Sequence, residues 1–345
     1  MRILLSATLV PFIHGGADYH IQGVAKALRE RGHEVELMRL PFRFGPEADI
    51  RELMRHVETL DMAAPNGIEI DRAISLQFPT WGLHHPDHTV WVMHQHRACY
   101  ELYDDALATP VQRELCGAVH AFDSRHLPQA RRLLANSRRV AERLRHYNGL
   151  KAEPLYHPPY AAERFRCYDD WGYVFYPSRL ESLKRQDLLI EAARYLKSPV
   201  RIIIAGEGGQ YQRYRALIEH HGLRDRVRLT GRISEDEKLA WYANAMAVFF
   251  GPFDEDYGYV TLEAMLAGKP VITCTDSGGP CEFVQHDETG WVVEPQPHQL
   301  AEAIDSAWAN RHRTAEMGRA GQAAYQKADI GWERVVATLL GEETA

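Results

Sequence analysis

Short apolar runs alternate along this chain with longer segments whose apolar residues recur every three or four positions. The first such group is an apolar run at residues 1–6, an amphipathic segment at residues 19–31 and a second apolar run at residues 35–40. Spacing by three and four places one face of a helix against a core, and a short uninterrupted run is typical of a buried strand. The pattern predicts a strand–helix–strand unit with a right-handed crossover.

The same alternation continues to the last residues, with one interruption. Further strands are predicted, with helices between them, at residues 73–77, 89–93, 133–136, 173–176, 200–205, 227–230, 247–250 and 271–274. A proline cluster, PLYHPP at residues 154–159, breaks the pattern. Because linkers are rich in such breakers, we place a domain boundary there. The predicted class is α/β, with domains at residues 1–160 and 161–325 and a terminal helix at 326–345.

Composition narrows the class of protein. The 345 residues are 45% hydrophobic and 25% charged, as in ordinary globular proteins, and the formal net charge of −7 disfavours a nucleic-acid partner. The five cysteines show neither C-x-x-C nor zinc spacing, and no histidine pair has further ligands at metal spacing. With no signal peptide and no membrane-spanning run, we expect a cytoplasmic protein that needs no metal.

One stretch, residues 249–270, combines several features of a binding site. An apolar run leads into an acidic loop with Glu255 and Gly258, and a helical pattern that contains Glu263 follows. Gly258 permits a sharp turn, and the first amides of a helix, here near Val260 and Thr261, have no partner within the helix. Those amides and the helix dipole favour an anion such as a diphosphate. Glu263 is then placed to reach a ribose, and Glu255 to reach what lies beyond the phosphates.

Other candidates follow the ends of predicted strands, where open α/β sheets bind ligands. Gly15 and Gly16 lie on the first loop, where a backbone without side chains lets a phosphate or sugar come close. His94 ends the strand at residues 89–93, with His96 as a rival. Arg179 and Lys184 are five residues apart across a strand-to-helix loop, so both cations can reach one diphosphate.

These motifs together resemble the retaining glycosyltransferases of family 4, which carry an E-x7-E signature. Here the signature runs from Glu255 to Glu263 and encloses an aromatic–glycine pair, Tyr257 and Gly258. The resemblance implies the GT-B fold: two Rossmann-like domains facing across a cleft, with the C-terminal helix crossing back to the first. This sequence departs from the family at Ser178, where glycine is usual.

The resemblance also implies residue roles. It assigns catalysis to Glu255, His94, Arg179 and Lys184. It assigns donor binding to Gly15, Gly16, Gly206, Gly208, Arg232, Ile233, Gly258, Tyr259, Val260, Thr261 and Glu263. No metal and no cofactor are expected, because cations and helix amides would neutralise the leaving diphosphate.

The implied reaction transfers a hexose, with retention, from a nucleotide-sugar to a glycan, lipid-linked or small-molecule hydroxyl, as in polysaccharide biosynthesis. UDP is favoured as the nucleotide, and GDP is the alternative. A nucleotide-sugar epimerase and a non-catalytic nucleotide-sugar binding protein remain open. Residues 125–145 hold seven arginines. They are read first as a solvated helix face, and second as a peripheral contact with the inner face of a membrane.

Overall fold

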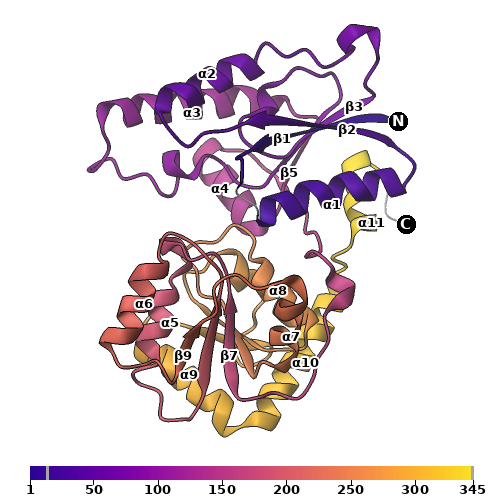
Figure 1. The fold of residues 1–345 in the computed structure, drawn as a ribbon. Helices are drawn as coiled ribbons and strands as arrows, with labels where there is room; N and C mark the ends of the chain where they lie inside the picture. Colours follow the sequence, from indigo (N-terminus) through magenta and orange to yellow (C-terminus); the bar gives the residue numbers. More distant parts are fainter. Residues whose placement is uncertain (13–14, 343–345) are drawn as a thin grey trace. The chain divides into compact units, whose positions relative to one another are not determined.

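The computed structural model describes residues 1–12 and 15–342. The chain divides into two compact units (Figure 1). The first unit comprises Met1–His157 and Gly331–Ala345, and the second comprises Pro158–Ile330. The change from one unit to the other at His157 lies inside the proline cluster. The predicted terminal segment 326–345 extends into residues 343–345, which lie outside the described residues.

The first unit is built on a six-stranded parallel sheet. Its spatial order is β2-β1-β3-β4-β5-β6, so the chain crosses over beside β1. The strands are β1 (Arg2–Leu9), β2 (Glu34–Pro41), β3 (Arg72–Ser75), β4 (His88–Val92), β5 (Arg132–Ala135) and β6 (Glu153–Pro154). The long helices are α1 (Gly16–Glu30), α2 (Glu47–Val57), α3 (Pro110–His126) and α4 (Arg138–Asn148). The polar amphipathic pattern of residues 47–62 predicts one helix, and the structure forms a helix only over Glu47–Val57.

The second unit repeats this architecture with the order β12-β11-β10-β7-β8-β9. Its strands are β7 (Tyr173–Pro177), β8 (Arg201–Ala205), β9 (Val227–Leu229), β10 (Ala247–Phe249), β11 (Val271–Cys274) and β12 (Gly290–Val293). Its helices are α5 (Gln186–Ala192), α6 (Tyr211–His220), α7 (Glu235–Asn244), α8 (Tyr259–Leu266), α9 (Pro297–Ala309) and α10 (Arg311–Lys327). Figure 1 shows α5 and α6 on one side of this sheet and α7 and α8 on the other.

Two helix starts follow the sequence signals closely. The hydroxyl of Ser137 accepts a hydrogen bond from the Val140 amide at 3.1 Å and caps α4. At α7, Ser234 and Glu237 form a reciprocal capping box. Such caps satisfy amides that the helix itself cannot.

The last helix, α11 (Trp332–Leu340), packs against α1 of the first unit (Figure 1). Gly23 of α1 makes this contact close, since a Cβ there would lie 2.2 Å from the Trp332 ring. The chain thus returns to its first unit after completing the second. Two parallel α/β sheets with a returning helix confirm the predicted fold class.

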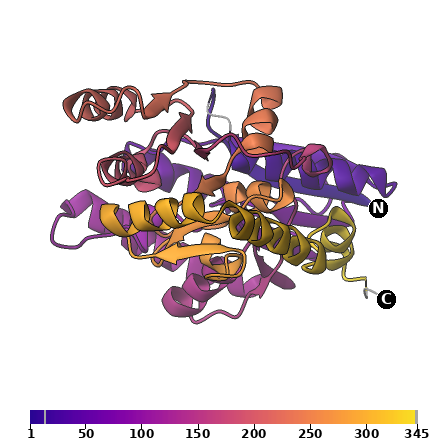
Figure 2. The same cartoon turned by 90° about the horizontal axis from the view of Figure 1, so that it is seen from below.

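Strands β6 and β12 were not predicted, and neither were two further features. Helix α10 follows directly on α9, as Figure 2 shows in orange-yellow near the C-terminal end. Its Gly318 lies against α8, where a Cβ would come within 2.1 Å of the Gly268 carbonyl oxygen. The second feature is a disulfide between Cys99 and Cys116, whose Cα atoms are 4.8 Å apart. Among the described residues, no helix is both long and apolar enough to cross a membrane.

Candidate active site

The junction between β10 and α8 has the predicted form. Gly258 caps α8 with a φ of 89°, a left-handed conformation that favours glycine. Tyr259 and Val260 form the first turn, so their amides have no acceptor within the helix. The Thr261 amide bonds the Gly258 carbonyl at 3.0 Å, and the buried Thr261 hydroxyl has no partner within the described part of the chain. The junction therefore offers donors to an anion.

Lys184 and Glu255 are in direct contact at this junction. The Lys184 ammonium lies 2.6 Å from a Glu255 carboxylate oxygen, and each side chain is 19% exposed. The backbone of Glu255 is fixed against the turn after β11, since its amide bonds the Ser277 carbonyl at 2.9 Å. A Cβ at Gly278 would lie 2.6 Å from the Glu255 carbonyl oxygen, so only glycine permits this approach. The structure thus joins a cation and a carboxylate that the sequence assigned to separate parts of the donor.

Arg185, which was not among the residues predicted from the sequence, holds together the two loops that carry this pair. Its guanidinium binds both carboxylate oxygens of Asp276, at 2.7 and 2.8 Å. It also donates to the carbonyls of Gly251 and Pro252, both at 2.8 Å. A planar guanidinium is suited to such a fork of acceptors. Arg185 therefore fixes the loop bearing Lys184 against the loop bearing Glu255.

Glu263 is held from α7. One carboxylate oxygen accepts from the Lys238 ammonium at 3.0 Å and the other from the Tyr242 hydroxyl at 2.6 Å. Burial lowers the pKa of Lys238, but the carboxylates of Glu263 and Glu235 outweigh this effect and hold that pKa above its ordinary value. Burial, and then the charge of Glu263, raises the pKa of Tyr259. The Glu263 carboxylate is thus fixed in direction before any ligand binds.

The loop that carries Arg179 is bound to the loop after β8. Leu180 donates its amide to the Glu207 carbonyl at 2.9 Å. A Cβ at Gly206 would lie 2.0 Å from the Ser178 carbonyl oxygen, and one at Gly208 would lie 2.5 Å from that of Leu180. These glycines therefore serve the packing of the two loops.

Three further candidates, one assigned to catalysis and two to donor binding, differ in exposure. The Arg179 side chain is exposed, with no ion-pair partner among residues 1–12 and 15–342. Arg232 is also exposed, and its guanidinium is 3.1 Å from the Glu207 carboxylate. Ile233 packs partly buried on the core of the second unit. Its neighbour Gly231 accepts the Gly206 amide at 2.9 Å, which links a third loop to the other two.

The first unit holds the remaining candidates at the carboxyl ends of β1 and β4. Gly15 precedes α1, and a Cβ built there would meet open space, so its backbone is accessible. Gly16 is the first residue of α1. Nδ1 of His94 is 2.8 Å from the Gln95 carbonyl oxygen. A carbonyl only accepts, so Nδ1 carries the proton and neutral His94 presents Nε2 as an acceptor.

His96, the rival of His94, is placed differently. Its ring packs against Phe78 and Phe42, with centroids 5.4 and 6.2 Å apart. Burial, and then the nearby charge of His94, lowers the pKa of His96 to about 4. This packing assigns His96 to the aromatic core and leaves His94 as the candidate for ligand contact.

The sequence missed the residues that hold the candidates in place. The supporting side chains are Arg185 and Asp276 for the Lys184–Glu255 pair, and Lys238 and Tyr242 for Glu263. Their partners are between 21 and 91 residues away in the chain. No local pattern contains that information; the only signal was the position of Arg185 directly after Lys184.

Comparison with known proteins gives a family match over part of the chain and a match of the fold over nearly all of it. Residues 163–324 match the family model described as "Glycosyl transferases group 1". A relative from Mycobacterium tuberculosis, "GDP-mannose-dependent alpha-(1-6)-phosphatidylinositol monomannoside mannosyltransferase", is 35% identical over 174 residues, which cover 47% of this chain and 44% of the relative. A "D-inositol 3-phosphate glycosyltransferase" from Pseudarthrobacter chlorophenolicus is 29% identical over 233 residues, 61% of this chain and 55% of the relative. The chain thus spans about half the length of these relatives.

Among solved structures, Anabaena HepE in complex with UDP and glucose superposes with a TM-score of 0.73 at 19% identity. The match covers 99% of this chain and 100% of that one. At this identity the likeness concerns the fold. It agrees with the GT-B architecture expected from the sequence.

Proposed function

We propose, from the match of residues 163–324 to the model of the group 1 glycosyl transferases, that this protein transfers a hexose from a nucleoside-diphosphate sugar to an acceptor hydroxyl. The observation that carries the proposal is the Lys184–Glu255 contact of 2.6 Å beside the start of α8. A cation, a carboxylate and the first turn of a helix at one junction suit a diphosphate with a sugar attached.

In the proposed complex, the diphosphate lies on the amides of Tyr259 and Val260. Lys184 and the exposed Arg179, which has no ion-pair partner among the described residues, neutralise its charge. Glu263 keeps lone pairs on both oxygens after binding Lys238 and Tyr242, and these accept from the ribose hydroxyls.

Glu255 orients the hexose by accepting from its hydroxyls. For the first unit, the family resemblance assigns donor binding to Gly15 and Gly16 and catalysis to His94.

The proposed reaction retains the anomeric configuration. The acceptor oxygen bonds to the anomeric carbon on the face from which the bond to phosphate breaks. The bonding pair leaves with the diphosphate, and the acceptor's proton passes to the departing phosphate oxygen. The cations and amides stabilise the charge that develops there, so the proposal includes no metal. A covalent intermediate would instead require a carboxylate that attacks the anomeric carbon.

For the donor and the acceptor we propose a chemical class and not a single compound. HepE was solved with UDP, whereas the name of the mycobacterial relative specifies GDP-mannose. UDP remains our first choice, with GDP as the alternative. The two relatives act, by their names, on inositol-containing acceptors, which supports a hydroxyl on a sugar or sugar-like ring.

Glu255→Gln tests the proposal. Removing the carboxylate charge while keeping the shape should lower kcat about 10²-fold or more, because the sugar is no longer held in its reactive position. The stabilisation of the protein by UDP or GDP in thermal melts should persist, since the nucleotide contacts remain.

Glu302→Gln, on the exposed surface of α9, is the matched control and should retain full turnover. Undiminished turnover by Glu255→Gln would end the assignment. If NMR shows that the donor sugar is epimerised when no acceptor is present, the protein is an epimerase instead.

A further inference from the structure

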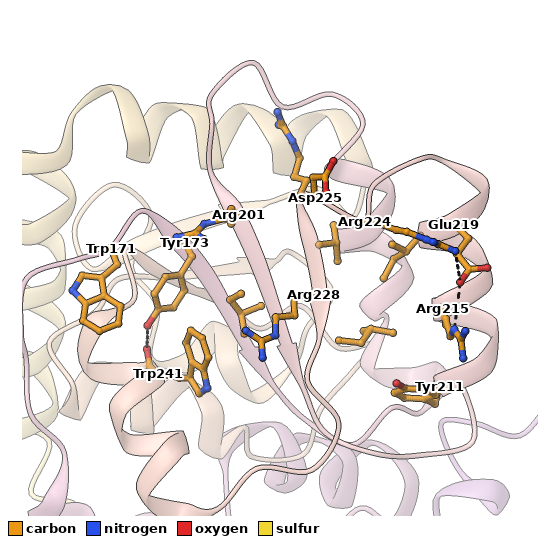
Figure 3. Close-up of a pocket in the computed structure, with 15 residues that line it drawn as sticks. Trp171, Tyr173, Arg201, Tyr211, Arg215, Glu219, Arg224, Asp225, Arg228 and Trp241 are labelled. Carbon is orange, nitrogen blue, oxygen red and sulfur yellow. Dashed lines mark hydrogen bonds and ion pairs between the residues drawn. The ribbon is translucent and has the colours of Figure 1, made fainter.

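The second unit contains a cavity that the proposed reaction does not use. It has a volume of about 590 Å³ and lies over β7, β8 and β9, bounded by residues of α6 and α7 (Figure 3). Strand register places Tyr173 beside Arg201 and Ile203 beside Arg228 on this part of the sheet. A cavity of this size accommodates a ligand of several rings.

The cavity is separated along the strands from the candidate active site. Tyr173 and Arg201 are the first residues of β7 and β8. Arg179 and Gly206, which belong to the candidate active site, follow the last residues of the same strands. Each strand has five residues, so roughly 13 Å of strand lies between the two ends. The cavity is therefore a second site within the same unit.

Its positive charge is only partly compensated. Arg215 and Arg224 both approach one oxygen of Glu219, at 3.3 and 3.0 Å. Arg201 and Arg228 are exposed, and neither has a carboxylate partner in the described ranges 1–12 and 15–342. Figure 3 shows these guanidinium groups spread along the cavity. A ligand with several separated negative charges matches this distribution better than one compact anion.

Aromatic rings provide flat contact surfaces between the charges. Trp171 is 64% exposed at one end of the cavity. Trp241 is fixed by packing on Tyr173, with ring centroids 5.3 Å apart, and Tyr211 lies at the other end (Figure 3). Exposed, rigid rings bind the apolar faces of flat ligands at little entropic cost.

We propose that this cavity binds an anionic oligosaccharide, with sugar rings on Trp171 and Trp241 and carboxylate or sulfate groups on Arg201 and Arg228. An acidic glycan has this structure, because its sugar rings carry negative charges at regular intervals. The choice of a saccharide over another polyanion rests on the proposed function, in which the protein handles sugars. The site would hold a stretch of acidic glycan apart from the reacting end.

The test measures binding of hexagalacturonate to the full chain by isothermal titration calorimetry, with maltohexaose as the neutral comparison. Hexagalacturonate should bind and maltohexaose should bind much more weakly. The double variant Arg201→Gln/Arg228→Gln should weaken hexagalacturonate binding about tenfold or more, because two charge-assisted contacts are lost. Trp171→Ala should weaken both the binding and its enthalpy.

Matched controls are available nearby. Arg213→Gln changes an arginine of α6 that pairs with Asp187, and Tyr195→Ala removes an aromatic ring that is 48% exposed. Neither residue lines the cavity, so both variants should bind like the wild type.

Binding that survives the double variant, or no binding of hexagalacturonate, would overturn the proposal and leave the arginines as charges that protect an edge strand. Stronger binding of hexaglutamate or of a thymidine hexanucleotide through Arg201 and Arg228 would overturn it in favour of a peptide or nucleic-acid ligand.

Nucleotide-sugar turnover, measured on the same variants, separates the two proposals. We expect it to be unchanged in Arg201→Gln/Arg228→Gln, since neither residue is part of the active site. Glycan binding without any donor turnover would contradict the proposed function but not this inference. Turnover without glycan binding would sink this inference alone.

Discussion

At the scale of single residues, the candidate site depends on charges that are partly withdrawn from water. Lys184 and Glu255 are mostly buried, and such a pair gains Coulomb energy but loses hydration. The pair is therefore poor evidence of stabilisation and better evidence of a site prepared for a ligand. The sequence predicted both residues and their chemistry. It did not predict their contact, because 71 residues separate them and no spacing rule spans that distance.

A substitution of Arg185 tests the role of its side chain without straining the backbone. Its φ of 52° is a left-handed conformation that glycine adopts without strain, so Arg185→Gly removes the clamp and preserves the backbone. We expect kcat to fall about tenfold or more, because the loops of Lys184 and Glu255 lose their common anchor. KM for the donor should change less than kcat, since Arg185 does not contact it. Steady-state kinetics with the donor sugar measure both.

Arg213→Gln serves again as the control. Full activity of Arg185→Gly would show that Asp276 and the two backbone carbonyls do not need the guanidinium to keep the site in order.

At the scale of elements, hydrophobic periodicity predicted most of the strands but not β6 or β12. The apolar runs became β1, β4, β7, β8, β10 and β11, because strands buried on both faces must be continuously apolar. Helix α10 was missed because Gly318 and Gly321 lower helix propensity. Tertiary packing explains the glycine at position 318, because Gly318 lets α10 approach α8 closely.

The packing of α1 on β4 carries a pH-dependent contribution to stability. His20 of α1 stacks on His157 and meets Trp91 edge-on, with centroids 3.9 and 4.2 Å apart. Burial lowers the pKa of His20 to about 3. The folded state therefore keeps His20 neutral while the unfolded state binds a proton below pH 6.5. Stability must fall as the pH drops below 6.5, by on the order of 2 kcal/mol from His20 at pH 5.

One buried acid opposes this trend. Burial raises the pKa of Asp123 to about 6, so the folded state takes up a proton that the unfolded state does not, and Asp123 adds on the order of 1 kcal/mol of stability at pH 5. His20→Phe keeps a ring in place and removes the titration. We measure the free energy of unfolding in urea at pH 7 and at pH 5. Its decrease from pH 7 to pH 5 should be smaller for His20→Phe than for the wild type or for the exposed control His298→Phe. Equal losses in all three proteins would refute the account.

At the scale of the whole molecule, the chain forms two α/β units, and its last helix belongs to the first of them. The sequence predicted this class, and the resemblance to family 4 anticipated the match of residues 163–324 to the group 1 glycosyl transferases. The roles of Gly206 and Gly208 could not be predicted, since only the folded loops reveal that both glycines contact the backbone of residues 178–180. Sequence patterns define which elements form, whereas the supports of a site depend on contacts between distant elements.

The central claim is that Arg179 and Lys184 bind a diphosphate at the start of α8. It is tested most directly by the dissociation constants of UDP and GDP for the wild type, Arg179→Met and Lys184→Met, with Arg213→Met as control. Arg179 is exposed and unpaired, so its variant should fold normally even where Lys184→Met is destabilised by leaving Glu255 without a partner. The account predicts that one nucleotide binds the wild type and that each variant weakens it about tenfold or more, with the control unchanged. Equal affinity in Arg179→Met, Lys184→Met and the wild type, or no binding of either nucleotide, would contradict it.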